Sequence, residues 1–296
     1  RIRLLWSFPS GVARRVIKLA GAGVSVLLAQ QLSVVALLWL APYGGDAGTL
    51  SLWQLSQAVY QLPYAIGVVP IVTATYPTIA AAVAQCDTAR WQALIARSTR
   101  LVAAVAATGV VLVIAIAPTI PLLFRADGQM TPAVVALAPA LIGMSLIYHF
   151  TRILYALDQA GPAVIAGTIG WTIVALSAAV FVVMSASAER AQSAATLTSF
   201  GIAHTLGLSI AAVILIRAVA KVAGRDALRG VASRVAVTTT TAVIAGMVGR
   251  AVVNTLIDTS MWSGLLAAVA GGTSVLIIVA ISVFVTERSS LGVKLQ

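Results

Sequence analysis

Three glutamines follow one another along a strongly apolar stretch of the sequence. Gln54, Gln57 and Gln61 are spaced i, i+3 and i+7, so on an α-helix they lie in one stripe. In lipid three amides on one face would be left without hydrogen-bond partners, so this face is expected to line a cavity or to cross-link helices. The pattern indicates a surface that binds through uncharged hydrogen-bonding groups.

The same stretch carries Pro63, Pro70 and Pro77 at seven-residue intervals. Each proline removes a backbone donor and clashes with the preceding turn, so the helix is expected to be kinked or broken. Such backbone is tolerated inside a membrane only against protein or a water-filled cavity. Transporters use discontinuous helices beside a polar midplane for their substrate sites. A glutamine stripe next to a proline break therefore favours a substrate cavity.

A second polar group precedes this stretch. Gln31 lies with Ser25, Gln30 and Ser33 near the middle of an apolar run at 17–41. These side chains fit a cavity and polar packing between helices equally well. The candidate cavity residues are Gln31, Gln54, Gln57, Tyr60 and Gln61.

Other kinds of chemistry find little support. The two histidines, His149 and His204, have no Cys, Asp or Glu at metal-ligand spacing, so neither a metal nor another cofactor is predicted. His204 is expected to bond to a neighbouring helix. All eight acidic residues fall in loops or at the ends of apolar runs, which leaves no intramembrane carboxylate pair for acid–base work. The sequence predicts neither an enzyme nor a catalytic residue.

The composition identifies lipid as the surroundings of these elements. Of the 296 residues 60% are hydrophobic and 9% are charged, and the mean hydropathy is +1.02. A soluble domain carries about 25% charged residues, so the soluble and the disordered classes are both excluded. The net charge of +11 is not arranged as basic stripes interleaved with aromatic residues, so no nucleic-acid partner is predicted.

Apolar runs long enough to cross a bilayer, which takes about 20 residues, occur eight times. They lie at residues 17–41, 50–80, 101–124, 132–156, 162–186, 194–217, 234–256 and 262–286. Short segments of strict alternation, which a membrane β-barrel needs, are absent from the sequence. The predicted fold class is all-α, a polytopic membrane protein with about eight transmembrane helices.

Basic residues are distributed unevenly between the two sides of these spans. Sixteen of the nineteen Lys and Arg residues fall on the side of the termini, and three fall on the other side: Arg125, Arg190 and Arg250. Positive charge marks the cytoplasmic side, so both termini are expected there. Residues 1–16 and 88–100 mix arginines with apolar side chains and are expected to lie along membrane lipid headgroups as interfacial helices.

Four stretches, taken in order, resemble the MurJ (MviN) family of lipid II flippases. The most specific is Tyr60-Gln-Leu-Pro-Tyr-Ala-Ile-Gly-Val68 followed by Thr75-Tyr-Pro-Thr-Ile79, which is similar to the family's eighth transmembrane region. The others are Arg15-Val-Ile-Lys18 before Gln30-Gln-Leu-Ser33, then Pro121-Leu-Leu-Phe124, and Arg152-Ile-Leu-Tyr-Ala-Leu-Asp158 before Gly161-Pro162. The resemblance covers nearly the whole chain but only the second half of the family's fourteen helices.

The resemblance implies the multidrug/oligosaccharidyl-lipid/polysaccharide exporter fold, in which two helical lobes surround a cationic cavity. Residues 17–224 would form the second, six-helix lobe, and residues 225–296 would form two extra helices with a groove for the lipid tail, followed by a cytoplasmic tail. A first lobe, missing from this chain, would complete the cavity. The assembly would move lipid II, the undecaprenyl-linked peptidoglycan precursor, across the bacterial inner membrane by alternating access.

One departure from the family keeps other functions open. The family's charged cluster before the leading proline appears here as Gln57, Ala58 and Gln61, and the arginine expected to hold the pyrophosphate falls on Ala58. This lobe would then offer amides but no fixed intramembrane positive charge. The alternatives are a related exporter of polysaccharide-lipid or drugs, and a transport-deficient membrane scaffold for cell-wall synthesis.

Overall fold

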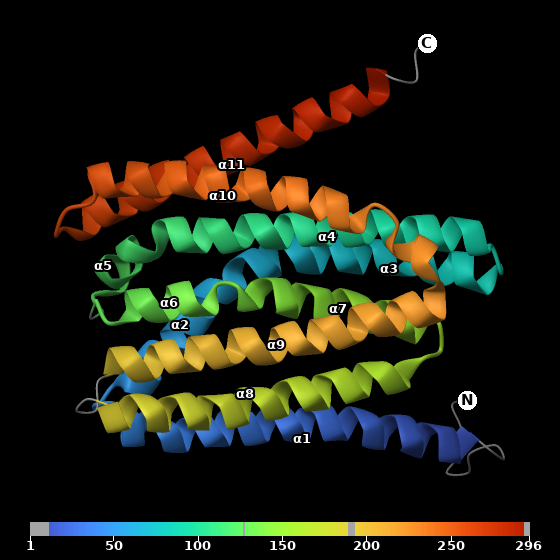
Figure 1. Ribbon diagram of the computed structural model, residues 1–296, viewed down its shortest axis with the longest axis horizontal. Coiled ribbons are helices and arrows are strands. Elements are labelled where there is room, and N and C mark those ends of the chain that lie inside the picture. Colours follow the sequence, from blue (N-terminus) through green and yellow to red (C-terminus); the bar gives the residue numbers. More distant parts are fainter. Residues whose placement is uncertain (1–11, 127, 189–192, 293–296) are drawn as a thin grey trace, which may run out of the picture.

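The computed structural model describes residues 12–126, 128–188 and 193–292, and every regular element within these residues is a helix (Figure 1). Eight helical segments of 22 to 37 residues are apolar enough to cross a membrane. The predicted all-α class with about eight spans is therefore confirmed. The first eleven residues of the predicted interfacial segment 1–16 lie outside the described residues.

Several spans are built from more than one helix. The first is α1 (Val12–Gly44), the second joins α2 (Thr49–Pro63), η1 (Tyr64–Val68) and α3 (Val69–Ala84), and the third joins α4 (Thr88–Ile116), η2 (Ala117–Thr119) and α5 (Ile120–Phe124). The fourth joins α6 (Met130–Leu137) and α7 (Ala140–Ala156), and α8 (Ala160–Ala188) and α9 (Ser193–Ala223) follow. Finally, η3 (Arg225–Leu228) leads into α10 (Val231–Leu256), and α11 (Met261–Gly292) is last.

The helices form a slab that runs from α1 at the bottom of Figure 1 to α11 at the top. Along it α1 packs on α8, α8 on α9, α9 on α6 and α7, and α4 on α7 and α10. The second span crosses this slab obliquely, because α2 packs on α6 whereas α3 packs on α4. The division into residues 17–224 and 225–296 remains a prediction.

One end of the slab lies on the right in Figure 1. It contains the junctions α3–α4, α7–α8 and α9–α10, and we call it the basic end. Its exposed basic side chains include Arg90, Arg97, Arg217, Lys221, Arg225 and Arg229. Which side of the membrane this end faces stays a prediction from the positive-inside rule.

Residues 88–100 differ from the expectation of a separate interfacial helix. They are the first turns of the continuous helix α4, whose start is capped by Asp87 through a hydrogen bond from the Arg90 amide (3.1 Å). Ile95 is fully buried in a cluster with residues of α7 and α9. The segment therefore packs inside the protein, because its apolar face finds protein partners before it reaches lipid.

Two devices attach the last two helices. Pro118 has no amide to offer the carbonyl of Ile114, which accepts from the Ala117 amide and from Nη1 of Arg250 on α10 (2.9 Å). The helices α10 and α11 approach closely at Gly249 and Gly271, where a Cβ on either residue would lie 2.8 Å from the carbonyl oxygen of the other. The absence of a side chain at both residues permits this close approach.

Replacing Arg250 with methionine should loosen α10 from α4, because the Ile114 carbonyl loses a charged donor. A hydrogen bond to a charged group is worth about 1.5–3 kcal/mol, so the free energy of unfolding should fall by roughly that amount. Denaturant unfolding in detergent measures the change. Arg97→Met is the matched control because Arg97 is exposed, and equal stability of the two variants would refute this role of Arg250.

Candidate functional site

The second span is interrupted next to Pro63. The α-helix ends at this proline, and a π-helical turn, Tyr64–Val68, follows before α3 begins. The proline ring packs on α4 at Gly109, where a Cβ would lie 2.8 Å from the Cβ of Pro63. A larger residue at 109 would push the interruption away from α4.

The other two prolines do not interrupt the helix. Pro70 lies in the first turn of α3, and the backbone remains α-helical at Pro77. The expectation of a break therefore applies to one position of three. The α-helical hydrogen-bonding pattern of this span is interrupted once, at the π-helical turn.

The glutamine stripe divides between two surroundings. Gln54 and Gln61 are exposed on the surface of the described chain, whereas Gln57 is half-buried and Tyr60 is buried. The Tyr60 hydroxyl donates to the sulfur of Met144 (3.6 Å). On α2 the positions 54 and 61 point in one direction, and 57 lies at the edge of the buried face. Gln54 and Gln61 are thus available to a ligand or a further lobe. Gln57 and Tyr60 attach α2 to the bundle.

Gln57 reaches His204, which confirms the expectation that this histidine bonds to a neighbouring helix. Its Nε2 lies 3.4 Å from Nε2 of His204, and Nδ1 of His204 lies 3.1 Å from the Phe200 carbonyl. Because a carbonyl only accepts, Nδ1 donates and Nε2 is left to accept from the Gln57 amide. Trp53 and Trp171 contact the imidazole, with ring centroids 4.9 and 5.9 Å away. His204 therefore joins α2, α8 and α9.

The polar group of α1 also divides. Ser33 is fully buried and donates to the carbonyl of Trp171 on α8 (2.7 Å), so it serves helix packing. Gln31 is exposed. Of the five candidate cavity residues, the structure leaves Gln31, Gln54 and Gln61 open at the surface and uses Gln57 and Tyr60 within the bundle.

A cation that sequence reasoning missed lies where α3 meets α7. The Arg152 guanidinium donates to the Tyr148 hydroxyl and lies 4.3 Å from the centre of the Tyr148 ring and 6.0 Å from that of Tyr76. Tyr64 of the π-helical turn meets Tyr148 edge to face, with ring centroids 5.6 Å apart. Nε of Arg152 is buried without a hydrogen-bond partner. The guanidinium is therefore held by aromatic rings, and part of its hydrogen-bonding capacity is unused.

We call Gln54, Gln61, Tyr64, Tyr148 and Arg152 the polar strip. Gln61 and Tyr64 are three residues apart and lie on one side of the helix. The order along the strip is therefore the Gln61 amide, the pair Tyr64 and Tyr148, and the Arg152 guanidinium. Tyr148 and Arg152 are four residues apart on α7, which is the signal that could have revealed them. Sequence reasoning had counted Arg152 among the charges at the end of the fourth span.

The strip can bind an oxygen-rich anionic ligand. An arginine matches phosphate oxygens through two parallel hydrogen bonds, and amides and phenols bind sugar or phosphate oxygens. Within the described parts of the chain, no three His, Cys, Asp or Glu side chains gather into a metal site.

The comparisons with known proteins point the same way. The sequence profile of the family Lipid II flippase MurJ matches residues 1–260. A solved structure titled "Lipid II flippase MurJ, inward closed conformation" superimposes with a TM-score of 0.68 at 14% sequence identity. The match covers 97% of this chain and 57% of that one. No curated relative matches the sequence significantly.

At 14% identity the structural match shows the fold, and the family is shown by the profile, which covers far more than half of the chain. The two agree with the resemblance carried by the Tyr60–Val68 stretch and with the second half of the exporter fold. The chain belongs to the lipid II flippase MurJ family.

Proposed function

We propose that this chain forms the second lobe of a lipid II flippase of the bacterial inner membrane and that its polar strip contacts the pyrophosphate and sugar of the lipid. Family membership supports the substrate, and the single observation that carries the site is Arg152 among three tyrosines beside the π-helical turn. Arg152 supplies a positive charge that the position of Ala58 lacks. The work of the chain is transport, so no catalytic group is assigned.

The cavity is completed by a first lobe outside this chain. Gln31, Gln54 and Gln61 are polar side chains exposed on helices that are otherwise apolar, and lipid would leave their amides unsatisfied. The length of the matched structure supports a further lobe, because this chain covers only 57% of it. Alternating access would then expose the strip to one side of the membrane at a time, with the basic end and both termini cytoplasmic.

The undecaprenyl tail of the lipid needs an apolar path next to the strip. The last two helices present exposed apolar side chains, among them Met247 of α10 and Leu266 and Leu276 of α11. We assign the tail to a groove formed by these helices. A related exporter would have the same fold, so the transported substrate distinguishes it from a lipid II flippase. A scaffold would not need the polar strip, so transport assays on variants of the strip test that alternative.

Replacing Arg152 with glutamine in the full-length protein should slow lipid II translocation about tenfold or more. The reason is that a charged hydrogen bond is worth about 1.5–3 kcal/mol and 1.4 kcal/mol corresponds to tenfold. Arg152→Lys, which keeps the charge, should retain part of the rate. Translocation of fluorescent lipid II in proteoliposomes measures the effect.

Arg97→Gln is the matched control, because Arg97 is an exposed arginine of the same end. Thermal unfolding of each variant checks that the fold is intact. A folded Arg152→Gln variant that translocates lipid II at the wild-type rate would rule out the polar strip as the contact. A folded wild-type protein that moves another lipid and not lipid II would favour the alternative exporter.

A cysteine at position 61 should react with a membrane-impermeant thiol reagent, because Gln61 faces the aqueous cavity in the proposed assembly. Cys86 is the one cysteine of this chain, so Cys86→Ser provides the background for the chain's own thiols. Leu176→Cys on α8 is the control, since Leu176 is an exposed apolar side chain expected to face lipid. Mass-shift labelling of the full-length protein in membranes measures both, and protection of position 61 to the same degree as position 176 would contradict the cavity.

A further inference from the structure

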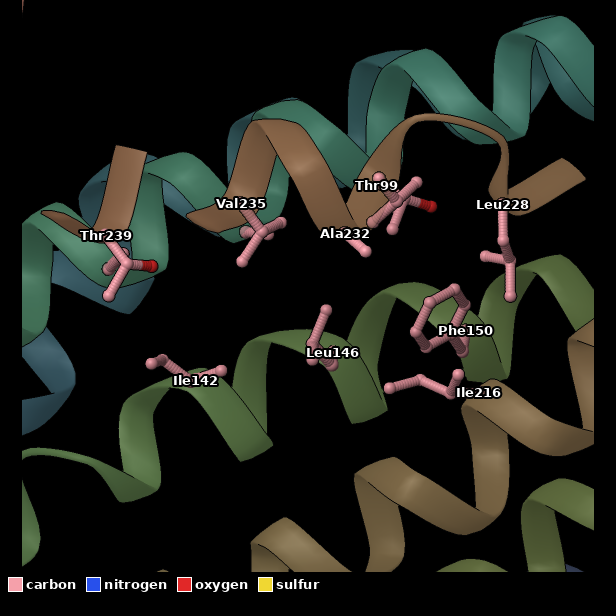
Figure 2. Close-up of a pocket in the computed structure, with 12 residues that line it drawn as sticks. Thr99, Ile142, Leu146, Phe150, Ile216, Leu228, Ala232, Val235 and Thr239 are labelled. Carbon is pink, nitrogen blue, oxygen red and sulfur yellow. The ribbon is translucent and has the colours of Figure 1, made fainter. Parts of the chain in front are cut away.

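An apolar cavity of about 290 Å³ lies between α10 and the six-helix lobe, near the basic end (Figure 2). Leu146 and Phe150 of α7 stand on one side, and Ala232 and Val235 of α10 stand opposite. A chamber with walls of this kind excludes water and loses packing energy when it is empty. Inside a membrane it suits a hydrocarbon chain.

This cavity is separate from the polar strip and from the side of α10 that meets α11. Leu146 and Phe150 lie two residues from Tyr148 and Arg152, which places the two pairs on opposite faces of α7. On α10 Thr239 lines the cavity, whereas Thr241, about 200° away around the helix, accepts from Ser282 of α11. The chamber continues along α10 into a shallower hollow that includes Val243 and Ile244.

Arginines follow the lining residues at the basic end of the cavity. Thr99, Ile216 and Leu228 come from three different elements, and each is directly followed in sequence by an arginine: Arg100, Arg217 and Arg229. Arg100 donates to the carbonyl of Arg229 (3.1 Å), which closes the loop between η3 and α10 over the chamber.

Arg217 and Arg229 are exposed, and no acidic side chain in the described part of the chain forms an ion pair with them. Asp226 lies on η3 between Arg225 and Arg229 and leaves this group with a clear positive excess. Basic groups between transmembrane helices next to an apolar chamber match the headgroup and the chain of an anionic lipid.

We propose that this cavity binds an anionic glycerophospholipid of the leaflet at the basic end, with one acyl chain between α7 and α10 and the phosphate against Arg217 and Arg229. The occupant is a resident lipid and not the transported one. It would hold α10 against the lobe by filling the space that α10 leaves beside α7 and α9. The proposal is independent of the flippase function.

The test uses the full-length protein, purified in detergent and stripped of lipid, and native mass spectrometry to count bound lipid. Dioleoyl-phosphatidylglycerol is the probe, and dioleoyl-phosphatidylcholine has the same chains without net charge. We expect one saturable phosphatidylglycerol site with at least about tenfold higher affinity than for phosphatidylcholine. Each of Arg217→Gln and Arg229→Gln should weaken it about fivefold, whereas Arg90→Gln, at the same end but away from the cavity, should not.

Ala232→Trp should fill the chamber and abolish the site, because Ala232 lies on its wall. Val248→Trp, at an exposed position on the other side of α10, is the matched control and should leave binding unchanged. Equal affinity for the two phospholipids, or full binding by folded Ala232→Trp, would overturn the proposal. Competition in the wild-type protein needs no variant: displacement of the phosphatidylglycerol by an equal amount of undecaprenyl phosphate would show a site for the transported lipid instead.

Discussion

A helix inside a bilayer has to satisfy its backbone hydrogen bonds within the protein, and this chain interrupts its helices with prolines in spite of that constraint. The interruptions are repaired by side chains from other helices. Arg250 of α10 reaches the Ile114 carbonyl before Pro118, and Thr205 of α9 donates to the Ala136 carbonyl before Pro139 (2.8 Å). Each repair is also a tertiary contact. The interruptions at Pro118 and Pro139 are therefore places where α10 and α9 bond to the backbone of other spans.

The interruption at Pro63 has a different consequence. Here the chain widens into a π-helical turn, and the turn brings Tyr64 against Tyr148, next to Arg152. The aromatic rings hold the half-buried guanidinium, since ring faces attract a cation without removing its hydrogen-bonding capacity. The groups that we propose to bind an anionic headgroup thus lie beside the same backbone feature that separates α2 from α3. The π-helical turn therefore sets where Tyr64 lies relative to the charge of Arg152.

The sequence was sufficient for the parts that depend on composition and period. The eight spans and the all-α class follow from apolar runs, and the expectation that His204 cross-links helices follows from its place in mid-span. The predicted helix boundary was wrong for residues 88–100, where packing competes with the local pattern. The sequence alone does not distinguish the buried Ile95 from a lipid-facing residue. Arg152 was missed because its partners Tyr64 and Tyr76 lie more than seventy positions away in sequence. The half-buried Gln57 could not be distinguished from the exposed Gln54 and Gln61 without knowing which side of α2 the bundle covers.

We propose that Arg152 and its tyrosines are the anion contact of this lobe. The most direct measurement is a structure of the full-length protein determined with bound lipid II. We expect pyrophosphate oxygens within hydrogen-bonding distance of the Arg152 guanidinium, on the side of the π-helical turn. A well-defined pyrophosphate held by other groups, with Arg152 still in contact only with Tyr148 and Tyr76, would contradict this assignment.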